Sequence, residues 1–425
     1  MPESLAPSRS QVALFSLAVT LVAFPNVRFG GGGVVILPEH IAIPIFLLLL
    51  LARRTVAPPA RSRLAIAGVI FVIFWSLFTL ASSVLVALDP PQSLRIMAWI
   101  ASNILSSILV YSLRTLIPYS LNVITSLLML VILVTLIGWA VAQSTRQIND
   151  FVEADYASLV FRLQGFFVEP NLYAAFLTLV AAMLYAWNKV VRPRLYWTFM
   201  GMGGFSIYLT FTRVAWVAFA VVLTASLLRT LRRRPLLLSV AVVGLVFVFV
   251  FATMGNQQGQ DSRSGDPLFD ATVGRITGLF NTAQGTGYTR VLTIESALSD
   301  LTTTGAWWTG FGLNGYSQVH DTGVTSWAAP YLPTLWIAIF YDGGIVAGVS
   351  FVIAVTLFWL ASRRSRGTIF FASFVLLAGA TNNVWFAFPW VLGAIVVGAA
   401  SYVTATEPPG QKRAAHSRSF ALTTP

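Results

Sequence analysis

Charged side chains that could act on an anionic ligand occupy a few short segments between long apolar runs. The first segment is Arg162-Leu-Gln-Gly-Phe-Phe-Val-Glu169-Pro170-Asn171, in which Glu169-Pro170 predicts the start of a helix. Helix N-termini attract anions, and a guanidinium can bind a phosphate through two parallel hydrogen bonds. Arg162 could therefore hold a phosphate at a membrane surface, with Glu169 close by. The alternative is that Glu169 only caps the helix and that Arg162 contacts lipid headgroups.

Further arginines stand at the ends of apolar segments. Arg213 lies between two hydrophobic runs with almost no loop, where an arginine is costly unless it pairs or reaches the headgroups. It could therefore snorkel to a lipid phosphate or face an internal cavity. Arg290 follows Tyr288 and opens Val291–Leu301, whose apolar pattern predicts a helix along the membrane surface. Arg275 lies in the same long polar segment and is a further candidate cation.

Few side chains could accept a proton near these arginines. His320 and Asp321 form the one neighbouring His–carboxylate pair outside the predicted spans, although neighbours in sequence need not face each other. The sequence has no Asp-x-Asp motif, no His pair at metal-ligand spacing and no Walker-type loop. We therefore expect no metal and no other cofactor, and nucleotide hydrolysis is not expected either.

The composition shows which elements must position these residues. Of the 425 residues, 56% are hydrophobic and only 10% are charged, with a mean hydropathy of +0.77. A soluble domain carries about a quarter charged residues. Because apolar runs of membrane-spanning length recur along the chain, we predict an all-α polytopic membrane protein. Cysteine is absent, so a disulfide framework is excluded.

About twelve membrane spans are predicted. They are Gln11–Phe24, Leu37–Ala52, Leu64–Leu88, Leu94–Leu116, Leu121–Ala142, Asn171–Val190, Tyr196–Phe211, Val214–Leu228, Pro235–Met254, Leu332–Ala361, Thr368–Val384 and Pro389–Val403. We interpret the first as an uncleaved span, because no small-residue cleavage site follows it. The tenth is overlong, and Gly343-Gly344 could kink it.

The charge distribution predicts how these spans are oriented. The formal net charge is +12, and most of the basic residues lie in short clusters between spans, such as Lys189–Arg194 and Arg229–Arg234. That distribution is the positive-inside pattern, so nucleic-acid binding is not expected and both termini should be cytoplasmic. Residues 1–254 would then hold nine spans, 255–331 an extracytoplasmic loop with short helices, 332–403 three spans, and 404–425 a disordered cytoplasmic tail.

Taken together, these residues resemble the O-antigen ligase and Wzy-type polymerase superfamily. The likeness covers roughly Phe161 to Val403. Its motifs are listed here in chain order: Arg162 with Gly165–Asn171, Thr212-Arg213, Arg290 with the helix after it, Gly310-Phe-Gly312, Asp342-Gly-Gly344-Ile, and Thr381-Asn382-Asn383.

The resemblance implies a GT-C-like membrane glycosyltransferase in a bacterial inner membrane, with its active site facing the periplasm. It would join glycans carried on undecaprenyl diphosphate by inverting, metal-independent transfer. Membrane lipids and a chain-length regulator protein are further candidate partners. Cleaving a sugar–diphosphate bond builds negative charge that preorganised cations can stabilise, and a carboxylate or histidine can take the proton of the attacking hydroxyl. The candidate cations are Arg162, Arg213, Arg275 and Arg290, joined in the binding site by Asn171 and Tyr288, and the candidate bases are Glu169 and His320, then Asp321 and Asp342.

Three functions remain open at this point. Ligases of the family usually carry a His-Asn pair upstream of the glycine that matches Gly344, but Pro333-Thr334 stands in that place. That departure favours a polymerase over a ligase that transfers the glycan to lipid A core. A non-catalytic transporter is the third hypothesis. It is disfavoured because the spans are almost free of charge and the sequence has no internal repeat.

Overall fold

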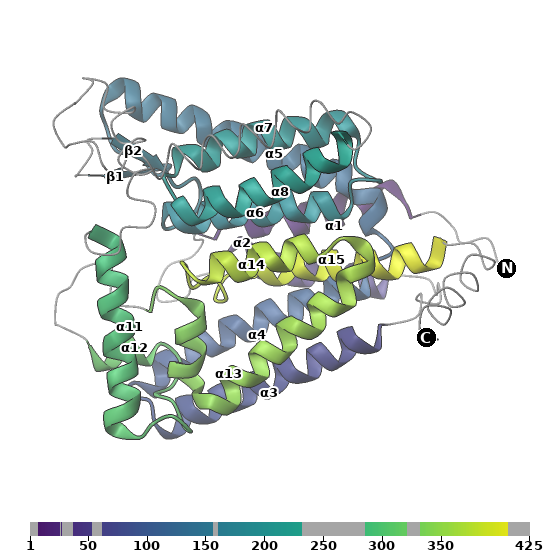
Figure 1. Cartoon of the computed structure of the whole chain (residues 1–425). Helices are drawn as coiled ribbons and strands as arrows, with labels where there is room; N and C mark the ends of the chain where they lie inside the picture. The colour runs from purple at the N-terminus through teal and green to yellow at the C-terminus, as the bar shows by residue number, and fades with distance from the viewer. Residues whose placement is uncertain are drawn as a thin grey trace, which may run out of the picture.

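Helices that run between two ends of the molecule make up most of the fold (Figure 1). The computed structural model describes residues 7–25, 27, 37–52, 62–155, 160–231, 285–320 and 332–406. Five of the described helices are long and apolar enough to cross a membrane. They are α3 (Arg63–Leu85), α4 (Pro90–Ser112), α5 (Ile117–Thr145), α8 (Arg213–Leu231) and α13 (Leu335–Ser362). The chain is a mostly helical, membrane-embedded protein.

Further helices coincide with the other predicted spans that the structure describes. They are α1 (Arg9–Thr20) with η1 (Leu21–Ala23), α2 (Pro38–Leu51), α6 (Pro170–Ala186), α7 (Pro193–Leu209), α14 (Thr368–Ala378) and α15 (Ala387–Thr406). The expected span to Val384 is too long, because α14 ends at Ala378. The expected ninth span, Pro235–Met254, lies outside the described residues, as does the tail after residue 406.

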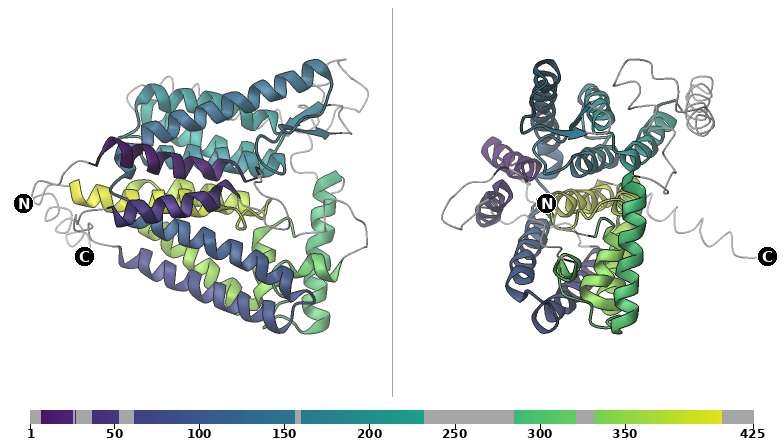
Figure 2. Two further views of the ribbon diagram at one scale, coloured as in Figure 1. Left: turned by 180° about the vertical axis from the view of Figure 1, so that it is seen from behind. Right: turned by 90° about the vertical axis from the view of Figure 1, so that its left-hand side faces the viewer.

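The end of the bundle opposite both termini carries the non-spanning elements (Figure 2). Strands β1 (Val152–Asp155) and β2 (Val160–Leu163) pair antiparallel there, in a short hairpin that the prediction of an all-α membrane protein does not include. Helix α11 (Gly285–Thr304) lies across the end of the bundle, and α12 (Gly315–Val319) follows it. The predicted helix over Val291–Leu301 is therefore confirmed. We call this region the polar end and the opposite one the termini end.

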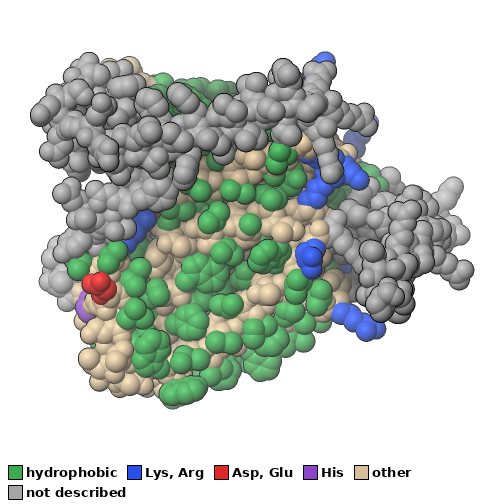
Figure 3. All heavy atoms as spheres, viewed as in Figure 1, with side chains coloured by type: hydrophobic (Ala, Val, Ile, Leu, Met, Phe, Trp, Pro, Cys, Tyr) green, Lys and Arg blue, Asp and Glu red, His purple; other side chains and the backbone are tan. Residues whose placement is uncertain are grey.

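The types of side chain on the surface also differ between the termini end and the polar end of the bundle. On the face shown in Figure 3, apolar side chains cover the middle, and most visible lysines and arginines lie toward the termini end. The visible carboxylates and histidine lie at the polar end. An apolar middle with a basic end is the surface that a positive-inside membrane protein presents to a bilayer.

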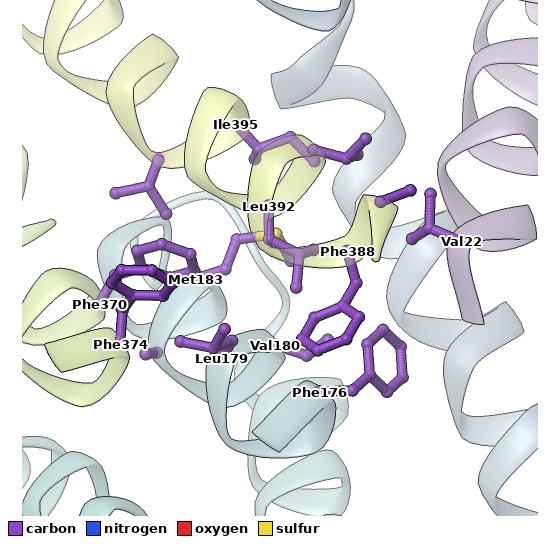
Figure 4. Packing of buried hydrophobic residues seen from close by; sticks show 14 of the residues in the cluster. Val22, Phe176, Leu179, Val180, Met183, Phe370, Phe374, Phe388, Leu392 and Ile395 are labelled. Carbon is purple, nitrogen blue, oxygen red and sulfur yellow. The ribbon is translucent and has the colours of Figure 1, made fainter. Parts of the chain in front are cut away.

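Helix α6 occupies the centre of the bundle. Its residues from Leu172 to Tyr185 are buried on every side, and it packs against α7, α8, α14 and α15. Figure 4 shows Met183 and Leu179 facing Phe370, Phe374 and Leu392 across this core. Because α6 begins at Pro170, this packing fixes the position of the polar end of the helix.

Helix α13 bends at Gly344, as the Gly343-Gly344 pair predicts. Gly344 has φ 74° and ψ −177°, a conformation that is essentially restricted to glycine. The bend leaves the carbonyls of Tyr341 and Asp342 without helical partners, and they accept hydrogen bonds from the N–H groups of Phe311 (2.8 Å) and Gly312 (2.9 Å). The turn before α12 is thus attached to the bend in α13.

The orientation can be tested with single thiols, because the chain has no cysteine. Thr145 ends α5 next to the hairpin, and Arg363 follows α13 at the start of the 3-10 helix η3 (Arg363–Ser365); both are exposed. In spheroplasts, Thr145→Cys should react with an impermeant maleimide, and Arg363→Cys should react only after permeabilisation. Labelling of Arg363→Cys in intact spheroplasts would show that the orientation is the opposite of the predicted one.

Gly344→Ala should destabilise the protein strongly. A Cβ at Gly344 would collide with the carbonyl of Trp308, and the backbone conformation alone is strained by roughly 1–3 kcal/mol for a non-glycine residue. The measurement is the free energy of unfolding in detergent. Gly201→Ala in α7 is the matched control, because no atom lies within 4 Å of its Cβ position. Equal stability of the two variants would mean that the bend does not require glycine.

Candidate functional site

Arg162 on β2 is held by three elements at the polar end. Its Nη1 donates to Oε2 of Glu153 on β1 (2.9 Å), in an ion pair across the hairpin. Its Nε donates to the carbonyl of Thr210 (3.0 Å), between α7 and α8, and its Nη2 donates to Oδ1 of Asn171 (3.4 Å). The Arg162 side chain is 14% exposed. The guanidinium is therefore fixed in position, in a side chain that is mostly buried.

Asn171 connects the start of α6 to the start of α8. Pro170 occupies the first turn of α6, as the Glu169-Pro170 pair predicts. The Oδ1 atom of Asn171 accepts hydrogen bonds from Oγ1 of Thr212 (3.0 Å) and from Arg162, and its Nδ2 donates to Oε2 of Glu169 (3.5 Å). One asparagine in the first turn of a buried helix thus positions the side chains around it.

The turn between α7 and α8 is tight and brings Arg213 into the same region. Phe211 adopts the left-handed conformation with φ 53°, and the N–H of Thr212 donates to Oγ1 of Thr210 (3.2 Å). Arg213, half-buried, is the first residue of α8 and directly follows Thr212. We call Glu153, Arg162, Glu169, Asn171, Thr210, Thr212 and Arg213 the Arg162 cluster.

A second group of polar side chains surrounds His320 after α12. Its Nε2 lies 2.7 Å from Oδ2 of Asp300 on α11, and the hydroxyl of Tyr341 donates to the same oxygen (3.0 Å). The Tyr316 ring lies 4.3 Å from the His320 ring, centroid to centroid. We call these four residues the His320 cluster. The carboxylate beside His320 is Asp300, whereas its sequence neighbour Asp321 lies outside the described residues.

Asp342, a candidate base, has contacts that hold the fold together. Its side chain is buried and accepts hydrogen bonds from the N–H groups of Asn314 and Gly315, at the start of α12. Its backbone carbonyl accepts from Gly312 (2.9 Å) and from Oγ of Ser82 on α3 (2.9 Å). The glycines at 310 and 312 serve the same junction, because a Cβ at Gly310 would lie 2.6 Å from the Asp342 carbonyl.

The remaining predicted residues lie on or before α11. Arg290 is on α11 and partly exposed. Tyr288 is on the same helix, but its side chain is not described, and Arg275 lies outside the described residues. Since the segment after α11 is attached to α13, the N-terminal end of α11 is the end that extends toward the β1–β2 hairpin (Figures 1 and 2). No hydrogen bond joins the Arg162 and His320 clusters among the residues described.

Two acidic partners escaped the sequence prediction. Glu153 lies opposite Arg162 in the hairpin, and a strand pattern in 152–155 and 160–163 would have suggested a cross-strand pair. Asp300 lies one helical turn after Ser296, whose Oγ is 3.5 Å from Nε2 of His320. The spacing of four residues places Ser296 and Asp300 on one face of α11, but the sequence does not show that this face contacts His320.

No family model matches this sequence, and neither does any curated protein. The likeness to the O-antigen ligase and Wzy-type superfamily therefore depends on the motifs and on their placement. Within the described ranges, no group of three His, Asp or Glu residues could hold a metal ion. The ionisable groups of the Arg162 and His320 clusters, among the described residues, are guanidiniums, carboxylates, the phenols of Tyr316 and Tyr341 and the imidazole of His320.

The contacts around Asp300 can be tested by a double-mutant cycle. Asp300→Asn and Tyr341→Phe should not be additive in unfolding free energy in detergent, because both alter one hydrogen bond. The coupling energy should be about 0.5–3 kcal/mol. Tyr341→Phe combined with Asp150→Asn, at an exposed position before β1, should be additive to within about 0.5 kcal/mol. Additivity in the first pair would contradict the hydrogen bond.

Proposed function

We propose that this chain is a Wzy-type polysaccharide polymerase. It joins oligosaccharide repeat units carried on undecaprenyl diphosphate by inverting, metal-independent glycosyl transfer. The reaction takes place at the periplasmic face of a bacterial inner membrane, and both termini are cytoplasmic. The basic clusters between the spans support this orientation, as do the two termini at the end away from the candidate site.

The convergence of separate motifs in the Arg162 cluster carries the proposal. Arg162, Glu169–Asn171 and Thr212-Arg213 come from a hairpin, a central helix and a helix start, and hydrogen bonds join them. A diphosphate that leaves a sugar gains negative charge in the transition state. A guanidinium whose position is already fixed stabilises that charge without reorganisation.

The His320 cluster supports a role for His320 as proton acceptor. If Nε2–H donates to Asp300, then Nδ1 is the ring nitrogen that can take a proton. The acceptor hydroxyl oxygen bonds to the anomeric carbon of the donor, its proton passes to Nδ1, and the bond from that carbon to the diphosphate oxygen breaks. Asp300 stabilises the imidazolium that forms, as a carboxylate does beside other catalytic histidines. Glu169 in the Arg162 cluster is the alternative base.

The test is a reconstitution of purified protein with its lipid-linked repeat unit, without metal or nucleotide. A ladder of products is the result expected of a polymerase. A single transfer to lipid A core, with no ladder, would identify a ligase. If the lipid-linked substrate crosses the membrane of a proteoliposome without any new glycosidic bond, the protein is a transporter.

Arginine variants measured in this assay should separate the site from the basic background. Arg162→Ala, Arg213→Ala and Arg290→Ala should each reduce polymer formation by about 10- to 150-fold, the value of a lost charged contact to phosphate. Arg→Lys should also be poor, because an ammonium cannot reproduce the two parallel hydrogen bonds. Arg95→Ala and Arg146→Ala, at exposed positions outside the motifs, are the controls. Similar small losses at all five positions, at equal expression and melting temperature, would refute a shared diphosphate site.

A further inference from the structure

A large apolar cavity lies in the half of the bundle near the termini. Its volume is about 340 Å³, and its walls come from α3, α4, α13, α14 and α15. Volumes of about 300–1,000 Å³ are usual for sites that bind small molecules. The lining is mostly aliphatic and aromatic side chains, so water would find few partners in it. Ile66 and Ile108, two of its lining residues, are exposed at the bundle surface, where a hydrocarbon chain could enter.

The polar groups in the wall of the cavity lie on its side nearer the termini end of the bundle. Ser107, Tyr111 and Ser112, near the end of α4, supply the polar groups of its wall. The buried hydroxyl of Tyr111 has no hydrogen-bond partner among the residues that the structure describes. Arg114 follows directly, and its guanidinium carbon lies 4.8 Å from the centre of the Tyr111 ring. A cation and one unsatisfied hydroxyl therefore lie at the termini end of an otherwise apolar cavity.

This arrangement matches an amphiphile with an anionic head. We propose that the cavity binds one acyl chain of an anionic phospholipid from the leaflet on the termini side, with its headgroup beside Ser112 and Arg114. The lipid-linked donor of the proposed reaction is a poor match, because its diphosphate would lie at the polar end. The inference does not depend on the proposed function.

Native mass spectrometry of protein reconstituted with equal amounts of phosphatidylglycerol and phosphatidylethanolamine tests the proposal. The wild-type protein should retain one phospholipid and favour phosphatidylglycerol by roughly tenfold, the value of one charged contact. Ser107→Trp should fill the cavity and reduce the retained lipid at least tenfold. Ser126→Trp is the matched control: Ser126 is an exposed serine of α5 that also bonds the carbonyl one turn before it. Arg114→Gln should retain phospholipid but lose the preference for phosphatidylglycerol.

Three results would overturn the proposal. Equal retention by the wild-type, Ser107→Trp and Ser126→Trp proteins would show that lipid binds elsewhere. Preferential retention of added undecaprenyl phosphate would assign the cavity to the polyprenyl chain. An unchanged preference in Arg114→Gln would remove the headgroup contact. If Ser107→Trp does not fold, Val69→Trp on the wall formed by α3 is the replacement, with the same expected loss.

Discussion

The bend in α13 at Gly344 is the constraint on which the polar end depends. A helix that breaks inside a membrane protein must find new partners for its freed carbonyls, since lipid offers none. Here the partners are the N–H groups of Phe311 and Gly312, while Ile345 N–H donates to the carbonyl of Trp307 (2.8 Å). The Ser83 hydroxyl on α3 accepts from Leu313 N–H (3.0 Å) and extends the junction. These bonds attach α11, α12 and His320 to the membrane helices, so the His320 cluster has a rigid base.

Much of the fold follows from hydropathy alone. The spans that became α3, α4 and α5 are predicted to within a few residues, because a run of apolar residues in lipid has no stable alternative to a helix. Hydropathy does not predict the hairpin, because strands of four residues carry too little alternation to distinguish them from a loop. The span ending at α14 was extended too far. Thr381 to Asn383 follow α14 as a buried non-helical segment, and hydropathy reports burial without reporting backbone shape.

The positions of candidate site residues were predictable where a sequence motif fixes the local backbone structure. Pro170 starts a helix, so Glu169 and Asn171 had to stand at its polar end. Arg162 and Arg213 were assigned to the same face by the orientation of the spans. The actual partners of Arg162 were not predictable, because its contacts to Glu153 and Thr210 depend on strand register and on a turn in the left-handed conformation. The partner of His320 was not predictable either, because a separate helix supplies the carboxylate beside it.

The complete burial of α6 also has a consequence for how the protein is made. This helix leaves the ribosome long before α14 and α15, the helices that cover two of its sides. Until those helices are synthesised, the same apolar surfaces must lie against lipid or against the membrane insertion machinery. Replacing lipid with protein around α6 is therefore a late step of biogenesis. The Arg162 cluster acquires its rigid support only once the last helices are in the membrane, so an incomplete nascent chain has the candidate residues without the scaffold that aligns them.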